Sequence, residues 1–285
     1  MDKTFYTDVD RKFLPGALAL MRSVRRHFPK SRRVIRLHGN FDKLPLWANF
    51  CGVAKIIPGQ SVEMSPAKTY YDMSFSRFDV SRIPGDYLIY ADADVVFSGR
   101  VDKLLEVPSG KIGLVSERKD GYMFRDQFVD ELKLDKILDR YEVEKNYYST
   151  NSGVIAGARE SWNIIWKKLK SLLESDVELY QISRGNQGIV QIALEETGLW
   201  YELPRHCNEI KTSNWNGKKP TALHFTRGNT RPWRAGSSRR DNSYLAFREW
   251  RKYSRVLDFT LNNTFWKELF WRVLDDIRPM VRRFK

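Results

Sequence analysis

The sequence predicts an α/β fold in which a mainly parallel sheet is flanked by helices, followed by a basic, helical C-terminal appendage. Strand-like and helix-like segments alternate along most of the chain, as in parallel-sheet proteins. Residues 87–91 are almost wholly apolar, which is typical of a strand buried on both faces of such a sheet. Residues 227–285 hold 15 Lys/Arg and 6 Asp/Glu, so most of the net charge of +14 lies at the C-terminal end. We therefore expect a domain over residues 1–233 and an appendage over residues 234–285.

The first half of the chain supplies five of the expected elements. Residues 4–7 are β-prone and form the first strand. Residues 14–27 repeat apolar side chains every three or four positions, which predicts a helix. Strands are expected over residues 33–37 and 53–57, the second of them closed by a Pro-Gly pair. A helix over residues 68–80 then leads to the apolar strand.

The second half continues the alternation, with no internal repeat. Apolar segments of strand length and periodic segments of helix length follow one another. The strands are expected over residues 112–115, 154–156 and 222–225, and the helices over 160–173 and 188–196. The polar, turn-rich residues 208–220 are expected to be a loop.

Composition excludes several classes of protein. A hydrophobic fraction of 42% over 285 residues allows a large core and excludes global disorder. No apolar run approaches the ~20 residues that span a bilayer, and no signal peptide is expected at the start. Cys51 and Cys207 are the two cysteines, too few for a disulfide framework or a cysteine-rich zinc module. These features favour a cytoplasmic location.

Two carboxylates follow the apolar strand directly. Asp92 and Asp94 stand one residue apart, and ligands of open α/β sheets bind where strands end. Keeping both carboxylates charged at this position costs free energy unless a cation is bound. Mg²⁺ and Mn²⁺ are suitable cations because they prefer oxygen ligands. Such an ion would also bridge a diphosphate and neutralise a phosphate leaving group. The alternative is a solvated, Asp-rich turn.

Five segments in order give the chain a resemblance to a known family. Residues 87–96 (YLIYADADVV) resemble the DxD segment of glycosyltransferase family 8, whose members have the GT-A fold. The other segments are residues 5–10 (FYTDVD), 151–155 (NSGVI), 186–190 (NQGIV) and 224–233 (HFTRGNTRPW). The match spans about residues 3–233. It implies a GT-A-like, metal-dependent enzyme that transfers a hexose, galactose or glucose, from a UDP-sugar to a cell-surface glycan or lipid-linked acceptor.

The resemblance implies a metal site. Asp92, Asp94 and His224 would hold the ion. An imidazole ligand favours Mn²⁺, with Mg²⁺ as the alternative ion. The alternative for His224 is a core histidine at the end of a strand. The remaining histidines, which lack such a context, are His27, His38 and His206.

The resemblance also implies donor-binding residues. Asp8, at the end of the first strand, would accept a hydrogen bond from the uracil N–H, with Thr7 and Asp10 beside the base and ribose. The alternative for these residues is a turn that caps the next helix. Further donor contacts are implied for Arg77, Ala93, Asn151 and Gly228. For the arginine of this set, the alternative is a charge on a helix surface.

Departures from the family pattern concern the catalytic residues. Arg231 stands where the family has Lys, and it lies one position further from the histidine than that Lys does. Its guanidinium can bind a leaving diphosphate through two hydrogen bonds. Gly228 would allow the backbone to approach the same diphosphate closely. Asn186 stands where the family commonly has Asp, so it cannot act as a nucleophile or base. With Gln187 beside it, we expect retention of configuration through front-face attack. An inverting GT-A transferase is the alternative, and it would need a carboxylate base.

The C-terminal appendage contains a basic, aromatic, amphipathic segment over residues 265–277, ended by Pro279. This combination favours peripheral binding to an anionic membrane, here at its cytoplasmic face. The alternative is a helix docked on its own domain. Two rival functions are a basic nucleic-acid-binding module, which we do not expect because the charge is confined to the tail, and an inactive transferase-like scaffold.

Overall fold

A computed structural model describes residues 1–10, 12–39, 54–59, 74–141, 148–226, 232 and 244–254. The strands are β1 (Lys3–Val9), β2 (Arg32–Leu37), β3 (Lys55–Pro58), β4 (Tyr87–Ala91), β5 (Val95–Phe97), β6 (Ile112–Ser116), β7 (Thr150–Ala158), β8 (Trp200–Leu203) and β9 (Ala222–His224). The α-helices are α1 (Leu14–His27), α4 (Glu131–Leu138), α5 (Arg159–Ser175), α6 (Val177–Ile182), α7 (Gln187–Glu196) and α8 (Tyr244–Arg251). Gly228, Arg231 and the expected helix over residues 265–277 lie outside the described residues.

Seven strands form one sheet in the order β3-β2-β1-β4-β7-β6-β8. Every pairing is parallel except those of β7, which runs antiparallel to both β4 and β6. The mainly parallel sheet that the alternation of elements predicts is therefore confirmed. Because β1, β4, β6 and β8 run in the same direction, their carboxyl ends meet at one edge of the sheet.

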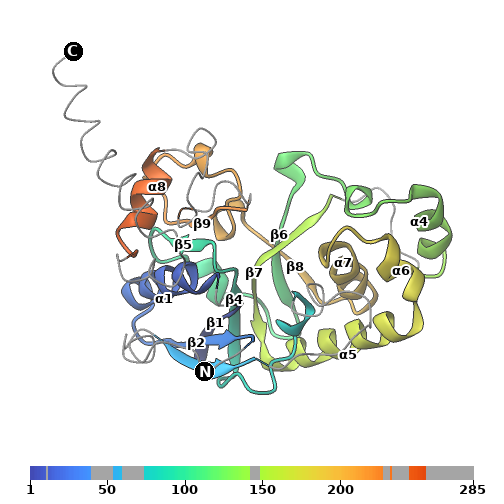
Figure 1. Ribbon diagram of the computed structural model, residues 1–285, viewed down its shortest axis with the longest axis horizontal. Coiled ribbons are helices and arrows are strands. Elements are labelled where there is room, and N and C mark those ends of the chain that lie inside the picture. The colour runs from blue at the N-terminus through green and yellow to red at the C-terminus, as the bar shows by residue number, and fades with distance from the viewer. Residues whose placement is uncertain are drawn as a thin grey trace, which may run out of the picture.

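Helices cover both faces of this sheet (Figure 1). On one face α1 packs against apolar side chains that include Phe5 of β1 and Ile89 of β4. On the other face α4, α5, α6 and α7 pack against alternate residues of the same strands, such as Tyr6 and Leu88. Strand β4 is thus buried on both faces, which explains why its sequence is apolar throughout.

A second, two-stranded sheet stands beside the first. Strand β5 follows β4 after a short turn and pairs antiparallel with β9, so that Val95 lies opposite His224. Helix α8 packs on this small sheet, with Trp250 in the same apolar cluster as Val96 and Leu223. Residues 244–254 of the expected appendage therefore contact the body of the protein. None of the described helices is both long and apolar enough to cross a membrane.

Agreement with the predicted elements is closest where apolar periodicity is strong. Helix α1 spans residues 14–27, the range that its spacing predicts. The helix expected over residues 68–80 is helical at 74–76 and then turns, as far as this segment is described. Strand β7 is longer than the three residues predicted for it. Elements that the sequence analysis missed are β5, β8, α4 and α6, which are short.

Candidate functional site

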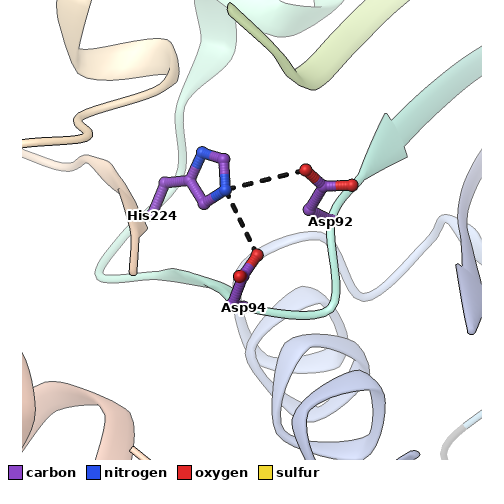
Figure 2. Close-up of side chains that lie close together, drawn as sticks. All are labelled: Asp92, Asp94 and His224. Carbon is purple, nitrogen blue, oxygen red and sulfur yellow. Dashed lines mark ion pairs between the residues drawn. The ribbon is translucent and has the colours of Figure 1, made fainter. Parts of the chain in front are cut away.

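Three ligand-type side chains converge at the carboxyl end of β4. Asp92 follows β4 directly, Asp94 lies in the turn before β5, and His224 ends β9. His224 Nε2 lies 3.2 Å from an Asp94 oxygen and 3.7 Å from Asp92 Oδ2. Figure 2 shows both carboxylates directed at this one nitrogen. The sequence separates the carboxylates from the histidine widely, and the β5–β9 pairing brings them together.

The cluster is largely enclosed. The side chains of His224 and Asp94 are 5% and 7% exposed, and that of Asp92 is 28% exposed. Burial alone would lower the pKa of His224, but the adjacent carboxylates of Asp94 and Asp92 outweigh it and raise this pKa above its ordinary value. The two carboxylates therefore give the enclosed imidazole surroundings that favour positive charge at this point.

Asp92 is held in place from the side away from His224. Tyr90 donates a hydrogen bond to Asp92 Oδ1 at 2.5 Å, and Arg77 Nη1 lies 3.2 Å from the same oxygen. The Arg77 guanidinium also lies over the Tyr90 ring, 4.5 Å from its centroid. With Oδ1 engaged, Oδ2 is the oxygen that faces the imidazole. The Arg77 side chain is 11% exposed and contacts the cluster, so it is not displayed on a helix surface.

His224 is held through its other ring nitrogen. Nδ1 lies 2.9 Å from Asn208 Oδ1, and Asn208 Nδ2 donates to Asn151 Oδ1 at 2.7 Å. Asn151 Nδ2 in turn donates to Glu117 Oε1 at 2.9 Å. The four residues that this series of hydrogen bonds connects are all buried. The carboxamide of Asn151 therefore faces the histidine side of the cluster.

Gly153 allows the imidazole to approach β7 closely. A Cβ atom at residue 153 would stand 2.0 Å from His224 Cε1 and 2.5 Å from Nδ1. Its backbone N–H donates to Asn151 Oδ1, and its carbonyl accepts from the Asp92 N–H. The Asn-Ser-Gly segment of β7 thus contacts both the histidine and a carboxylate of the cluster.

Asn186 and Gln187 lie at the start of α7. Asn186 Nδ2 donates to the Ser74 carbonyl at 3.1 Å, and Arg77 Nε donates to the same carbonyl. Gln187 Nε2 donates to the Thr150 carbonyl at 3.0 Å, one residue before Asn151. Both amides are therefore connected to segments that hold the cluster, and the N-terminal end of a helix adds partial positive charge beside them.

The residues predicted to hold the base have different surroundings. Asp8 is buried and forms two hydrogen bonds with Arg36, from Nε at 2.8 Å and Nη2 at 2.6 Å, and Ser76 donates a third. Burial alone would raise the pKa of Asp8, but Arg36 and His38 hold it well below its usual range. Asp10 accepts from the backbone N–H groups of residues 12 and 13, before α1. Asp10 thus forms a turn before α1, but the N-cap residue of this helix is Phe13 and no side chain caps it, so the capping alternative is not seen.

Thr7 points away from Asp8. Side chains alternate along β1, so Thr7 shares the α1 side of the sheet with Phe5 and Val9, and it is fully buried. Ala93, between the two aspartates, is also buried. Contacts of these residues with a nucleotide remain predictions.

Comparison with known proteins gives the fold. No protein-family profile and no curated protein sequence matches the chain. Among solved structures, the bifunctional glycosyltransferase WbbM matches with a TM-score of 0.64 and 12% identity, over 95% of this chain and 51% of WbbM. The galactosyltransferase LgtC, in complex with donor and acceptor sugar analogues, matches with a TM-score of 0.60 and 13% identity, over 88% of this chain and 94% of LgtC. The glycosyltransferase GlyE of Streptococcus pneumoniae TIGR4 matches with a TM-score of 0.58 and 16% identity, over 94% of this chain and 64% of GlyE. The chain has a GT-A-like fold.

The resemblance that the sequence motifs predict is therefore confirmed at the level of the fold. The chain corresponds to about half of the WbbM chain and to nearly all of LgtC. In this GT-A-like fold, the Asp92–Asp94–His224 cluster lies at the carboxyl edge of the sheet, where the sequence predicts a ligand site.

The cluster fits a divalent metal. One ligand atom from each of its three residues lies within 4.8 Å of the others. The donor set is two carboxylate oxygens and one imidazole nitrogen, which suits Mn²⁺ better than Mg²⁺. The Nδ1 atom is already bonded to Asn208, so Nε2 is the nitrogen available to a cation. This is the arrangement that metal-binding histidines commonly have.

Sequence reasoning missed several members of the site. Arg36, Glu117 and Asn208 each contact a predicted residue, and none was singled out. Asn208 lies in the segment expected to be only a loop. No pattern in the sequence marks a lone Asn or Glu as the partner of a residue far along the chain. Tyr90 stands in the recognised DxD segment. Because neighbouring residues of a strand face opposite sides of a sheet, its position beside Ala91 could have indicated that these two side chains lie on different faces.

A cleft of about 1000 Å³ opens at the same edge of the sheet. Val115 and Ser116 at the end of β6 and Leu203 at the end of β8 are among the residues that line it. Its walls include two aromatic residues, Tyr148 and Trp215, and the basic side chains Arg118, Lys119 and Lys219. Arg118 lies 5.6 Å from the Tyr148 ring centroid. Polar groups beside aromatic faces make this a surface suited to a polar ligand with apolar ring faces.

Proposed function

We propose that this protein is a metal-dependent glycosyltransferase that moves a hexose, galactose or glucose, from a UDP-sugar to a cell-surface glycan or lipid-linked acceptor. The observation that carries the proposal is the Asp92–Asp94–His224 cluster at the carboxyl edge of a GT-A-like fold. LgtC, which has this fold, is a galactosyltransferase with donor and acceptor analogues bound. A Mn²⁺ ion held by these three residues would neutralise the diphosphate as it leaves.

The chain's own residues have separate tasks in this proposal. Arg77 and Tyr90 orient Asp92, so that its second oxygen faces the cation. Asp8 accepts from the uracil N–H while Arg36 keeps it charged. Arg231, with Gly228, adds positive charge beside the pyrophosphate. Asn151 and Gln187 offer amide groups to the hydroxyls of the donor sugar.

Retention without a covalent intermediate suits the amides at residues 186 and 187. Neither Asn186 nor Gln187 can attack the sugar, so the acceptor hydroxyl attacks C1 from the face that the diphosphate leaves. The C1–O bond to UDP breaks, a new C1–O bond forms on the same side, and the acceptor proton passes to the leaving diphosphate oxygen. The amides orient the sugar and exclude water during this exchange.

The cleft beside the cluster is suited to the acceptor. Sugar rings present apolar faces that stack on aromatic side chains, and Trp215 and Tyr148 provide such surfaces. The cleft shares its walls with the site, because Glu209 in its wall bonds through its backbone to His224. A glycan bound there would reach the metal cluster along the edge of the sheet.

A panel of nucleotide sugars tests this function. The protein should hydrolyse UDP-galactose or UDP-glucose slowly with Mn²⁺, and addition of a chelator should stop the reaction. NMR of the transferred sugar should show the anomeric configuration of the donor. Binding of oligonucleotides in a salt-sensitive manner, with no affinity for UDP, would instead favour a nucleic-acid-binding protein.

The C-terminal tail gives this function a proposed place, at the cytoplasmic face of an anionic membrane. Deletion of residues 264–285 is expected to weaken sedimentation with anionic vesicles and transfer to a lipid-linked acceptor, while UDP-sugar hydrolysis stays nearly intact. The basic and aromatic side chains of this segment supply the membrane contacts, not the chemistry. Vesicles of neutral lipid serve as the control. A truncated protein that unfolds, or that binds anionic vesicles as before, contradicts the membrane role.

A further inference from the structure

We propose that Asn208 is a positioning residue for the metal site, and that with Asn151 and Glu117 it forms a fixed relay of hydrogen bonds that sets the orientation of His224. This inference rests on the proposed function, because it concerns how the metal ligand is held. It assigns roles to two residues, Asn208 and Glu117, that lie outside every recognised sequence motif.

The relay has one consistent direction, which begins at Glu117. A carboxylate accepts hydrogen bonds and donates none, so the atom of Asn151 that faces Glu117 at 2.9 Å is the amide nitrogen. Asn151 Oδ1 therefore turns the other way, where it accepts from the Gly153 N–H and from Asn208 Nδ2. With its nitrogen engaged, Asn208 presents its oxygen to His224. Each amide orientation thus follows from the one before it.

The consequence falls on the imidazole. Because an oxygen faces Nδ1 at 2.9 Å, Nδ1 carries the proton and donates it. Nε2 would then be the atom that offers its lone pair to a cation held with Asp92 and Asp94. A side chain at residue 208 without an acceptor would leave Nδ1 unpaired in a buried position. The interaction that stabilises this tautomer and this ring orientation would then be absent.

The packing around the ring supports the same role. Asn208 is fully buried, and the hydrogen bonds of its side chain go to Asn151 and His224. Gly153 lies against the adjacent edge of the ring, where a Cβ atom would overlap Cε1 and Nδ1. The histidine is thus fixed by a hydrogen bond at Nδ1 and by close contact with β7. Burial of an unpaired amide is costly, so this placement of Asn208 depends on both partners.

The test compares two substitutions at residue 208 with a matched control. Asn208→Leu removes both hydrogen bonds, whereas Asn208→Asp keeps an acceptor for Nδ1. Gln191→Leu is the control, because Gln191 is a buried amide that bonds to the Thr150 N–H and touches no ligand of the cluster. Mn²⁺ affinity is measured by electron paramagnetic resonance with UDP present, and folding by thermal unfolding.

We expect Asn208→Leu to bind Mn²⁺ about 10- to 100-fold more weakly than wild type, the usual effect of losing such a partner. Asn208→Asp should recover most of this affinity, and Gln191→Leu should bind as wild type even where it unfolds earlier. A folded Asn208→Leu protein with wild-type affinity overturns the proposal, as does an equal loss in Gln191→Leu.

A second measurement separates this inference from the proposed function. In metal-free protein labelled with ¹⁵N-histidine, the His224 Nδ1–H should give a slowly exchanging resonance that Asn208→Leu abolishes. If wild type shows this resonance but binds no Mn²⁺, the relay stands and the metal-dependent function fails. If the resonance is absent from wild type, or persists in Asn208→Leu, the relay is wrong whatever the metal affinity.

Discussion

Asp92→Ala and Asp94→Ala proteins are each expected to lose Mn²⁺-dependent UDP binding and to turn over donor at least about a hundredfold more slowly. A metal ion contributes several kcal/mol to the stabilisation of a leaving diphosphate, and each 1.36 kcal/mol is a factor of ten in rate. Either substitution leaves one carboxylate and His224, too few ligands to hold the ion against the diphosphate charge. Calorimetry with UDP, with and without Mn²⁺, measures the loss.

In the metal-free protein, Asp94→Ala should disturb the surroundings of His224 more than Asp92→Ala does. Asp94 lies nearer to His224 than Asp92 does, so its removal takes away the closer partner of a buried imidazole. Asp102→Ala is the control, because this exposed aspartate pairs with Arg100 and is not a member of the cluster. Unchanged UDP affinity with Mn²⁺ in both cluster variants would exclude the proposed metal site.

Arg36→Met is expected to destabilise the protein by about 3–5 kcal/mol, the range found when one partner of a buried ion pair is removed. Asp8 and Arg36 have side chains that are 3% and 5% exposed, so water cannot replace the lost guanidinium. Arg36 also donates to the backbone carbonyls of Ser76 and Asp79, which the variant leaves without that donor. Chemical unfolding at pH 7 measures the change.

The pH dependence of this loss identifies its cause. In wild type the pKa of Asp8 lies well below its usual range, so the stability that the ion pair provides is complete above about pH 4 and is lost only as the pH falls through this lowered pKa. Without Arg36, burial raises the pKa of Asp8, and acid neutralises the carboxyl group. The difference between variant and wild type should therefore shrink from pH 7 to pH 4.

A double variant separates the ion pair from the packing around it. Asp8→Asn with Arg36→Met removes both charges, and it should recover part of the stability that Arg36→Met loses. A deficit that does not change with pH, and that the second substitution does not reduce, would mean that the lost backbone hydrogen bonds, not the unpaired charge, cause the instability.

Local patterns were sufficient to predict the mainly parallel sheet and the pair of carboxylates at its edge, whereas His224 was assigned only through the family resemblance. The uninterrupted apolar residues 87–91 predict a strand buried on both faces, and β4 is buried throughout. A strand of this kind also places Asp92 at the edge of the sheet, whatever the rest of the chain does. The helix over residues 14–27 has enough turns for its periodicity to define both ends. These features depend on neighbouring residues in the sequence.

The supporting contacts depend on distant segments and could not be predicted in this way. Arg36 reaches Asp8 because β2 pairs with β1 in a particular register, with residue 36 opposite residue 8. Asn208 follows β8, and its side chain reaches Asn151 of β7, although β6 stands between these two strands in the sheet. Short strands such as β5 have too few residues to show a period, although β5 is what brings His224 to Asp94.

The pairing of β5 with β9 gives the cluster a role in the energetics of the whole chain. Two of its members precede β5 and the third ends β9, and α8 packs on the same pair of strands. A cation bound there would cross-link the turn after β4 to the end of β9. By mass action, metal binding would then stabilise the β5–β9 pair on which α8 packs. Occupancy of the site and the stability of this small sheet would therefore be thermodynamically linked.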